Sequence, residues 1–336
     1  MAARHKIRQN DYLYLSGRIH AMENRLLTRE RMERMLDAHS VQEAAKVLGE
    51  CGYDELNAET PTELERALAK ERLKLFHELG NAAPDPGLTD VFRIPYDYHN
   101  AKALLKSEAM GLDSSRLLVD AGRYPAAMLK AKLEEDGLDH KFSDVFRTAV
   151  TEAKETLGRT RDPQKADLLL DRAYFKELGQ AAEDCGSKFL AGYVRVMIDS
   201  ANLRSAVRAA RMEQDGAFLD QVLLEGGNVP TAKLKEAALG GSGLSDPFRG
   251  SELYEAAQCG EEAMKGGSLT RFEKLCDDGV THYLMQGKRV AFGEHPVIGY
   301  LYAKEAELTT IRMILTGKMA GLDSETIRER LRESYV

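Results

Sequence analysis

Cysteine thiols are the first candidates for chemistry in this sequence, because a thiolate binds zinc, forms disulfides and acts as a nucleophile. The chain has four cysteines, at wide and irregular spacings without a C-x-x-C pair: Cys51, Cys185, Cys259 and Cys276. This spacing is typical of neither a disulfide framework nor a zinc site. We expect free thiols that are buried as small apolar side chains.

Histidines and paired acids are the next candidates for catalysis. The eight histidines contain no H-E-x-x-H pair, and Asp277-Asp278 lacks further carboxylates at helical spacing that would complete a magnesium site. Neither Gly287-Lys288 nor Gly317-Lys318 continues into the Ser or Thr of a phosphate-binding loop. We therefore predict that the protein is not an enzyme and has no catalytic residue, cofactor, metal site or small-molecule substrate.

Three further pairs of charged residues share one spacing, in which an acid is followed five residues later by a base. The pairs are Asp97 and Lys102, Asp199 and Arg204, and Glu307 and Arg312. Five residues of an α-helix turn through about 500°, which leaves the two side chains about 140° apart and unable to pair on one face. We predict that each acid or base reaches a neighbouring helix and fixes how the helices pack. Solvated surface charges are the alternative.

The elements that carry these residues should all be helices. Thr60-Pro61-Thr62-Glu63 is a capping box with Pro at the first helical position, and apolar residues follow it at the 3.6-residue period. Ser40 and Asp162-Pro163 predict two further helix starts, whereas the glycine-rich stretch 240–250 predicts a loop. Alternating strand-like stretches are missing. The sequence therefore predicts an all-α fold.

One segment of the sequence recurs three times. Asn100–Leu105 ends in Gly111-Leu112-Asp113-Ser114, and 210 positions later Thr310–Leu315 ends in Gly321-Leu322-Asp323-Ser324. The glycine suits the left-handed end of a helix and the aspartate suits the N-cap of the next helix. We expect core positions at the same points of each copy. They are Ala101, Leu203 and Ile311, and Leu105, Val207 and Leu315.

The middle copy, Asn202–Val207, lies 102 positions after the first and lacks the Gly-Leu-Asp ending. A second matching segment supports it, because Leu118–Pro125 resembles Leu223–Pro230. The repeating unit is thus a little over 100 residues, long enough for a helical lobe with its own core. We predict three lobes. Their residues are 1–113, 114–216 and 217–336, and the last lobe carries a C-terminal stub that closes onto the first.

Charge and hydropathy narrow the class of partner. The net charge of −7 argues against nucleic-acid binding, which depends on Lys and Arg neutralising phosphates, although the second corner, 321–328, superficially resembles a helix-turn-helix. No apolar run is long enough to span a membrane, and the N-terminus lacks the apolar region of a secretory signal. Residues 1–35 carry an excess of basic residues that includes Arg4, Lys6 and Arg8.

The two ends of the chain resemble a known family. The stretch His295–Glu307, followed by Ile311–Leu315 and Ile327–Leu331, is similar to the C subunit of the archaeal and bacterial V/A-type rotary ATPases, the counterpart of the d subunit of the eukaryotic vacuolar enzyme. Asp11–Tyr14 and Arg18–Glu23 also resemble the start of that family. With the repeat between these ends, the resemblance covers essentially the whole chain.

The resemblance implies a funnel of three similar helical lobes about a pseudo-threefold axis. In this family the funnel receives the foot of the rotating central shaft and rests on the membrane ring that carries protons or sodium ions. The chain would then be a peripheral, non-catalytic coupling subunit on the cytoplasmic face of the cell membrane. The basic N-terminal residues Arg4, Lys6 and Arg8 would face the ring or the membrane. A helical protein-protein scaffold unrelated to rotary ATPases is the alternative.

Overall fold

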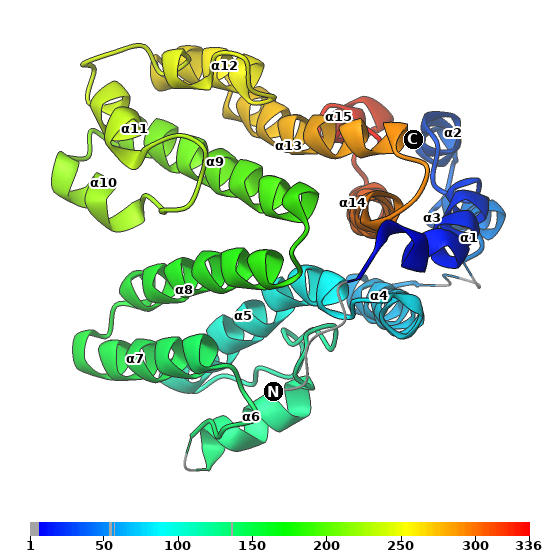
Figure 1. Ribbon diagram of the computed structural model, residues 1–336, viewed down its shortest axis with the longest axis horizontal. Helices are drawn as coiled ribbons and strands as arrows, with labels where there is room; N and C mark the ends of the chain where they lie inside the picture. Colours follow the sequence, from blue (N-terminus) through cyan, green and yellow to red (C-terminus); the bar gives the residue numbers. More distant parts are fainter. Residues whose placement is uncertain (1–6, 54–55, 57, 136) are drawn as a thin grey trace. The chain divides into compact units, whose positions relative to one another are not determined.

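The computed structural model describes residues 7–53, 56, 58–135 and 137–336 (Figure 1). This part of the chain consists of helices, turns and loops without a β-strand, so the predicted all-α class is confirmed. It forms two compact units. Unit 1 combines Met1–Pro86 with Ser242–Val336, and unit 2 is Gly87–Gly241. These units do not follow the boundaries of the three expected lobes, which remain a prediction.

Unit 2 is built around two long helices, α8 and α9, which are consecutive in the chain. Its helices are α5 (Gly87–Met110), α6 (Ala126–Glu134), α7 (Asp144–Thr160), α8 (Pro163–Asp184), α9 (Lys188–Arg211), α10 (Gly216–Val222) and α11 (Thr231–Ala238). Helices α5 and α7 pack against α8, and α10 and α11 pack against α9. The unit is therefore continuous in sequence, and each helix contacts near neighbours along the chain.

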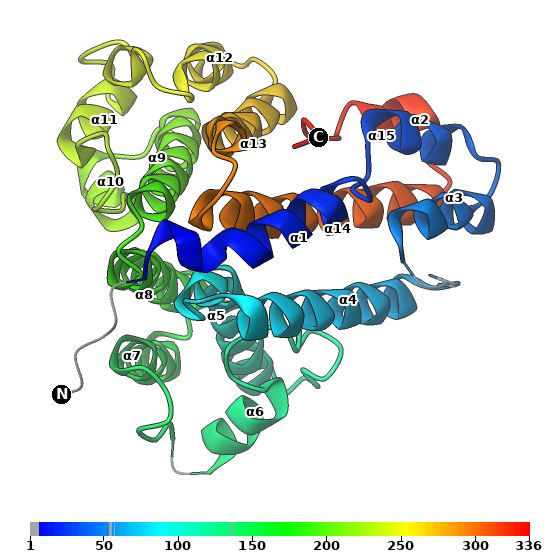
Figure 2. The same cartoon turned by 45° about the vertical axis from the view of Figure 1, so that its right-hand side comes forward.

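Unit 1 brings an N-terminal and a C-terminal segment of the chain together around α14. Its N-terminal elements are η1 (Gln9–Tyr12), α1 (Leu13–Glu23), α2 (Arg29–Asp37), α3 (Val41–Val47), η2 (Leu48–Cys51) and α4 (Pro61–Ala82). Its C-terminal elements are η3 (Asp246–Phe248), α12 (Tyr254–Met264), α13 (Leu269–Met285), η4 (Gln286–Arg289), α14 (Glu294–Met319) and α15 (Ser324–Arg328). Helices α1, α3 and α4 all contact α14, and Figure 2 shows α1 running alongside it.

The predicted helix starts are confirmed. The Thr60 hydroxyl accepts a hydrogen bond from the Glu63 amide at the start of α4, and the Glu63 carboxylate accepts one from the Thr60 amide. Ser40 caps α3 and Asp162 caps α8 through their side-chain oxygens. In the expected loop 240–250 the chain adds only the short turn η3. Local capping chemistry thus fixes these boundaries.

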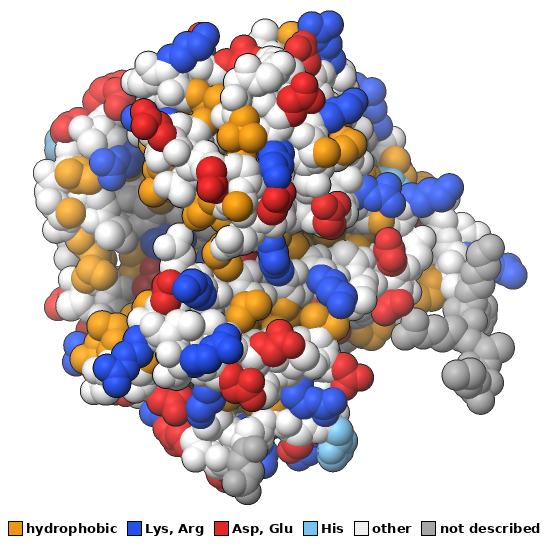
Figure 3. Space-filling model, turned by 90° about the vertical axis from the view of Figure 1, so that its left-hand side faces the viewer, with side chains coloured by type: hydrophobic (Ala, Val, Ile, Leu, Met, Phe, Trp, Pro, Cys, Tyr) orange, Lys and Arg blue, Asp and Glu red, His pale blue; other side chains and the backbone are white. Residues whose placement is uncertain are grey.

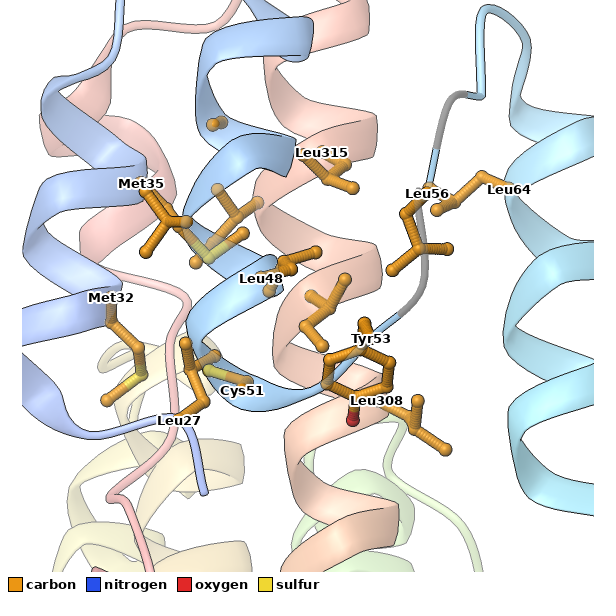
Figure 4. Close-up of a cluster of buried hydrophobic side chains, with 14 of the residues drawn as sticks. Leu27, Met32, Met35, Leu48, Cys51, Tyr53, Leu56, Leu64, Leu308 and Leu315 are labelled. Carbon is orange, nitrogen blue, oxygen red and sulfur yellow. The ribbon is translucent and has the colours of Figure 1, made fainter. Parts of the chain in front are cut away.

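The six predicted core positions on α5, α9 and α14 are buried, which confirms them as core. In unit 1, α14 shares one apolar cluster with α2, α3 and α4, and Figure 4 shows side chains such as Met35, Leu48 and Leu315 coming together. Cys51 belongs to this cluster, and burial raises the pKa of its thiol to about 11. All four cysteines are free, but Cys185 is only half-buried, contrary to the expectation for that residue.

The ends of α5, α9 and α14 share one geometry. Gly111 and Gly321 are left-handed, with φ of +65° and +71°, as predicted. In the middle copy the equivalent residue is Glu213, which adopts φ of +52° even though it has a side chain. In all three corners the next amide donates to a carbonyl five residues earlier. These bonds are Leu112 to Ser107, Gln214 to Ala209 and Leu322 to Gly317.

The segments after the three corners differ. Asp215 and Asp323 cap α10 and α15, so the middle copy keeps the capping aspartate even though its Gly-Leu pair is lost. Asp113 was expected to cap a helix but accepts hydrogen bonds only from Ser115, and no helix follows. In this segment Asn100 instead binds the backbone of Val119.

Candidate functional site: three buried carboxylates on the longest helices

The three longest helices of the described chain each carry one of the predicted acids. Asp97 lies on α5, Asp199 on α9 and Glu307 on α14, and their residues are only 1%, 3% and 6% exposed. Burying a carboxylate is costly unless hydrogen bonds or an opposite charge compensate it. The partners of each acid therefore define what the site does.

Asp97 binds the loop that precedes α6. Its Oδ2 accepts a hydrogen bond from Arg123 Nε at 2.7 Å and its Oδ1 accepts one from the Tyr124 amide at 3.2 Å. Burial raises the pKa of Asp97 to about 6, although the Arg123 guanidinium opposes the shift. Arg123 also lies 2.9 Å from Glu177 of α8, so this guanidinium joins α5, the loop and α8.

Glu177 extends this cluster. Its Oε2 accepts a hydrogen bond from the Tyr98 hydroxyl at 2.8 Å, and its Oε1 accepts one from the hydroxyl of Ser143, the N-cap of α7. Burial and the neighbouring Glu177 charge raise the pKa of Tyr98 well above its ordinary value, so the phenol stays a donor. Four elements of unit 2 thus meet at two buried carboxylates.

Asp199 binds the corresponding loop before α11 without a cation. Its Oδ2 accepts from the amide and the side chain of Asn228, at 3.0 and 2.9 Å, and its Oδ1 accepts from the Val229 amide at 3.0 Å. Burial raises the pKa of Asp199, and these three donors limit the rise. Hydrogen bonds alone therefore compensate the burial of this carboxylate.

Two asparagines reinforce the same attachments, and the sequence pattern gave them no role beyond marking the repeat. Asn100 exchanges a pair of hydrogen bonds with the backbone of Val119, both at 2.8 Å. Asn202 forms the same pair with Leu224, at 2.8 and 2.7 Å. Each asparagine lies three residues after the acid, and this recurrence in the sequence could have revealed them. At this position α14 has Thr310 instead.

Close approach of the loops explains two glycines. A Cβ on Gly122 would lie 2.2 Å from Asp97 Oδ1, and a Cβ on Gly227 would lie 2.1 Å from Asp199 Oδ1. Neither distance is possible for non-bonded carbon and oxygen atoms, so each carboxylate requires glycine at this point of the loop. The two glycines occupy matching places in the segments 118–125 and 223–230.

Glu307 of α14 binds segments that come from the N-terminal part of unit 1. Its oxygens accept hydrogen bonds from the Leu27 amide and the Tyr53 hydroxyl, and Lys304 Nζ lies 2.7 Å from that hydroxyl. Leu27 immediately precedes Thr28, the N-cap of α2. Burial and the Glu307 charge raise the pKa of Tyr53 well above its ordinary value. The third acid thus also binds the loop before a helix.

The predicted basic residues have different surroundings. Lys102 Nζ lies 2.5 Å from Asp171 of α8, and Arg312 reaches Glu65 of α4 at 3.8 Å on a partly exposed surface. Arg204 donates to Ser200 of its own helix. No acid pairs with the base five residues later in these contacts. The acids reach loops, and Lys102 and Arg312 reach neighbouring helices.

The basic N-terminal residues and the paired acids are the other groups singled out from the sequence. Arg4 and Lys6 lie outside the described residues, whereas Arg8 is exposed and its amide donates to Asp11 at 2.7 Å. Asp277 and Asp278 bind the C-terminal segment through Arg332 Nε and the Glu333 amide, at 2.6 and 2.8 Å. Within the described ranges no three His, Cys, Asp or Glu residues are placed to hold a metal ion.

The arrangement of the three acids is suited to holding helices and loops in fixed positions. Each acid accepts hydrogen bonds from donors of its own chain. On the surface shown in Figure 3, basic and acidic side chains are interspersed rather than gathered by sign. A hydrogen-bonded, buried carboxylate fixes the geometry of its surroundings because losing one partner leaves an uncompensated charge.

Comparison with known proteins gives one consistent result. The family model described as the ATP synthase (C/AC39) subunit matches residues 15–330. The C subunit of the V-type sodium ATPase of Enterococcus hirae is 25% identical over 97% of this chain and 99% of its own length. The C subunit of the A-type ATP synthase of Methanocaldococcus jannaschii is 26% identical (95% and 86%), and that of the V-type ATP synthase of Thermus thermophilus is 22% identical (96% and 98%).

Proposed function

Because this chain belongs to the ATP synthase (C/AC39) subunit family, we propose that it is the non-catalytic coupling subunit of a V/A-type rotary ATPase. In this role it links the rotating central shaft to the membrane ring that carries protons or sodium ions, and it transmits torque between them. Its partners are the shaft subunits and the ring, and it lies peripherally on the cytoplasmic face of the membrane.

The observation that carries this proposal is the recurrence of one buried carboxylate on each of α5, α9 and α14. A part that transmits torque must deform little under load, and each acid fixes a long helix to a loop from elsewhere in the chain. Hydrogen bonds to an ionised group contribute about 1.5–3 kcal/mol each, more than neutral ones. The three clusters therefore stiffen the elements that a coupling subunit needs to keep rigid.

We extend the proposal to the arrangement of the chain as three lobes about a pseudo-threefold axis, as in a funnel. The boundaries remain 1–113, 114–216 and 217–336. The matching corners of α5, α9 and α14, and the matching carboxylate contacts of Asp97 and Asp199, support a common lobe structure. An experimental structure of the chain within its complex tests the arrangement directly.

The attachment to the membrane side is proposed to involve the basic N-terminal segment. None of the helices in the described ranges is both long and apolar enough to cross a bilayer. Near an anionic leaflet each Lys or Arg contributes about 1 kcal/mol of attraction. Reversing the charge of Arg4, Lys6 and Arg8 should therefore weaken attachment to the ring. Unchanged co-purification with the ring would remove this part of the proposal.

The coupling role is tested by two measurements on membranes of the source organism. Affinity purification of the tagged chain after gentle solubilisation should retain shaft and ring subunits in fixed stoichiometry. Vesicles that lack the chain should then retain ATP hydrolysis but lose ATP-driven ion pumping, and adding the chain should restore pumping. Pumping that persists without the chain would contradict the coupling role, and retention of unrelated proteins alone would favour a different scaffold function.

A further inference from the structure

The C-terminal tail of unit 1 packs against both α13 and α14. Tyr335 is only 4% exposed, and a Cβ on Gly299 of α14 would lie 2.2 Å from the Tyr335 hydroxyl oxygen, so a glycine at 299 makes room for the ring. Lys288 donates to the Tyr335 carbonyl oxygen, and its Nζ lies 4.5 Å from the ring centroid. Unit 1 thus holds this non-helical segment by an aromatic side chain and a cation.

Polar contacts hold the rest of the tail against α13. Asp277 pairs with Arg332 and Asp278 accepts a hydrogen bond from the Glu333 amide, and His282 lies 2.7 Å from the Glu333 carboxylate. The tail therefore packs without forming a helix, through main-chain and side-chain contacts of Arg332, Glu333 and Tyr335.

Unit 2 contains the matching pair of helices without such a segment. Asp199 and Glu307 are 108 positions apart, as are Leu203 and Ile311, so α9 matches α14 in this register. Gly299 then corresponds to Ala191. Ala191 lines an open groove of about 600 Å³ between α8, α9, the end of α10 and the loop 223–226. The groove in unit 2 thus lies beside the residue that matches Gly299, the position against which Tyr335 packs in unit 1.

The floor of this groove is apolar and its walls are charged. Phe175, Val194, Ile198, Leu223 and Leu224 provide apolar surface. A groove of this size and lining is typical of sites that bind a side chain or small ligand.

The walls carry charges of both signs, and two of the cations are available to an anionic group. Asp220 is paired with Lys235 at 2.7 Å, Glu225 accepts a hydrogen bond from Thr231, and Glu183 also lines the groove. Lys176 of α8 and Arg195 of α9 line walls formed by different helices, and neither has an acidic partner in the described part of the chain.

We propose that this groove in unit 2 is a docking site for an extended peptide segment of another protein, in which an aromatic residue lies next to a carboxylate. The aromatic ring would occupy the apolar floor beside Ala191, as Tyr335 occupies the space beside Gly299. The carboxylate would lie between Lys176 and Arg195. Aromatic side chains that fill a pocket commonly contribute most of the binding energy at such interfaces. The docking site does not depend on the coupling role.

The test uses the full-length chain and a fluorescent peptide with the sequence of residues 331–336, Leu-Arg-Glu-Ser-Tyr-Val, with a free C-terminal carboxylate. Fluorescence anisotropy should show saturable binding of one peptide per chain below about 1 mM, the range of weak single-segment contacts. Lys176→Glu combined with Arg195→Glu should weaken binding at least tenfold, and so should Ala191→Trp, which fills the groove. Lys188→Glu, an exposed charge reversal at the start of α9 that does not line the groove, should leave binding unchanged.

Other outcomes overturn the proposed docking site. Absence of peptide binding to the parent chain up to about 1 mM would do so. Equal melting of the variants and the parent shows that any weakened binding does not come from unfolding. Tyr335→Ala in the protein could strengthen binding while the unit 2 variants leave it unchanged. That result would place the peptide where the tail packs in unit 1 instead. Light scattering should show a monomer, and a dimer that the double variant dissociates would make a second copy of this chain the occupant.

Discussion

In both units a buried carboxylate on a long helix accepts a hydrogen bond from a loop amide. The loop follows the helix along the chain in unit 2 but precedes it in unit 1. In unit 2, Asp97 and Asp199 bind amides 27 and 30 residues later. In unit 1, Glu307 binds the amide of Leu27, which lies 280 residues earlier. The loop before α2 thus takes the place that the loops before α6 and α11 take in unit 2.

In unit 1 the contact of the α14 carboxylate is therefore completed by the N-terminal part of the chain. Unit 2 contains both halves of its contacts in one continuous segment, whereas unit 1 requires its two ends to meet. The C-terminal residues strengthen the same closure, because Ser324 donates to Leu36 and Arg328 pairs with Glu33 of α2. Unit 1 should therefore depend on both termini, and unit 2 on neither.

The largest expected effect comes from removing residues 327–336. This deletion removes three buried side chains, Ile327, Leu331 and Tyr335, and at about 1.5–3 kcal/mol each it should lower the free energy of unfolding of unit 1 by more than about 4 kcal/mol. Hydrogen exchange should show lost protection in α2 as well as in α13, with α7 and α8 unchanged. Deleting only Val336, which is 39% exposed, is the control. Loss of protection confined to α13 and α14 would contradict the closure.

The next effect isolates unit 2. Gly122→Ala and Gly227→Ala each place a Cβ against a buried carboxylate oxygen, and each should cost about 3 kcal/mol or more, the range in which a buried ion loses a partner. Gly158→Ala, within α7 and with no atom within 4 Å of the added Cβ, should instead stabilise the helix by up to about 1 kcal/mol. Urea unfolding measures all three. If Gly122→Ala and Gly227→Ala changed the free energy of unfolding no more than Gly158→Ala does, the carboxylate contacts would not be needed for stability.

Sequence reasoning predicted the fold class and the capped helix starts, because these depend on local patterns of capping and hydrophobic period. The three acids were selected because they recur at one spacing in the aligned helices. The proposed family was confirmed by the match over residues 15–330. The loop partners of the acids could not be predicted, since nothing local to Glu307 points to Leu27 or Tyr53. Gly122 and Gly227 were visible as matching residues, but their function depends on how closely each loop approaches its helix.

A smaller effect concerns the corners. Glu213 occupies a left-handed conformation that costs an L-residue about 1 kcal/mol, so Glu213→Gly should raise the stability of unit 2 by about that amount. Gly111→Ala should lower it by a similar amount, because the added Cβ has no atom within 4 Å and the cost lies in the backbone alone. Thermal unfolding of the two variants gives the comparison. Destabilisation by Glu213→Gly would mean that contacts of the Glu213 side chain contribute more to the stability of this corner than the backbone strain costs.

The smallest effect returns to unit 1, where His20 joins α1 to the loop before α14. Its ring nitrogens lie 2.9 Å from Glu23 and 3.0 Å from the Ala291 carbonyl oxygen, and these two contacts raise the pKa of His20 above its ordinary value. The stabilisation is therefore complete below about pH 6.5 and is lost as the pH rises through the raised pKa. It should be under about 1 kcal/mol, because the side chain is nearly half exposed. The melting temperature of His20→Gln should thus differ from the parent more at about pH 6 than at about pH 8.5, whereas a difference that is the same at both would mean that the charge on His20 does not hold α1 in place.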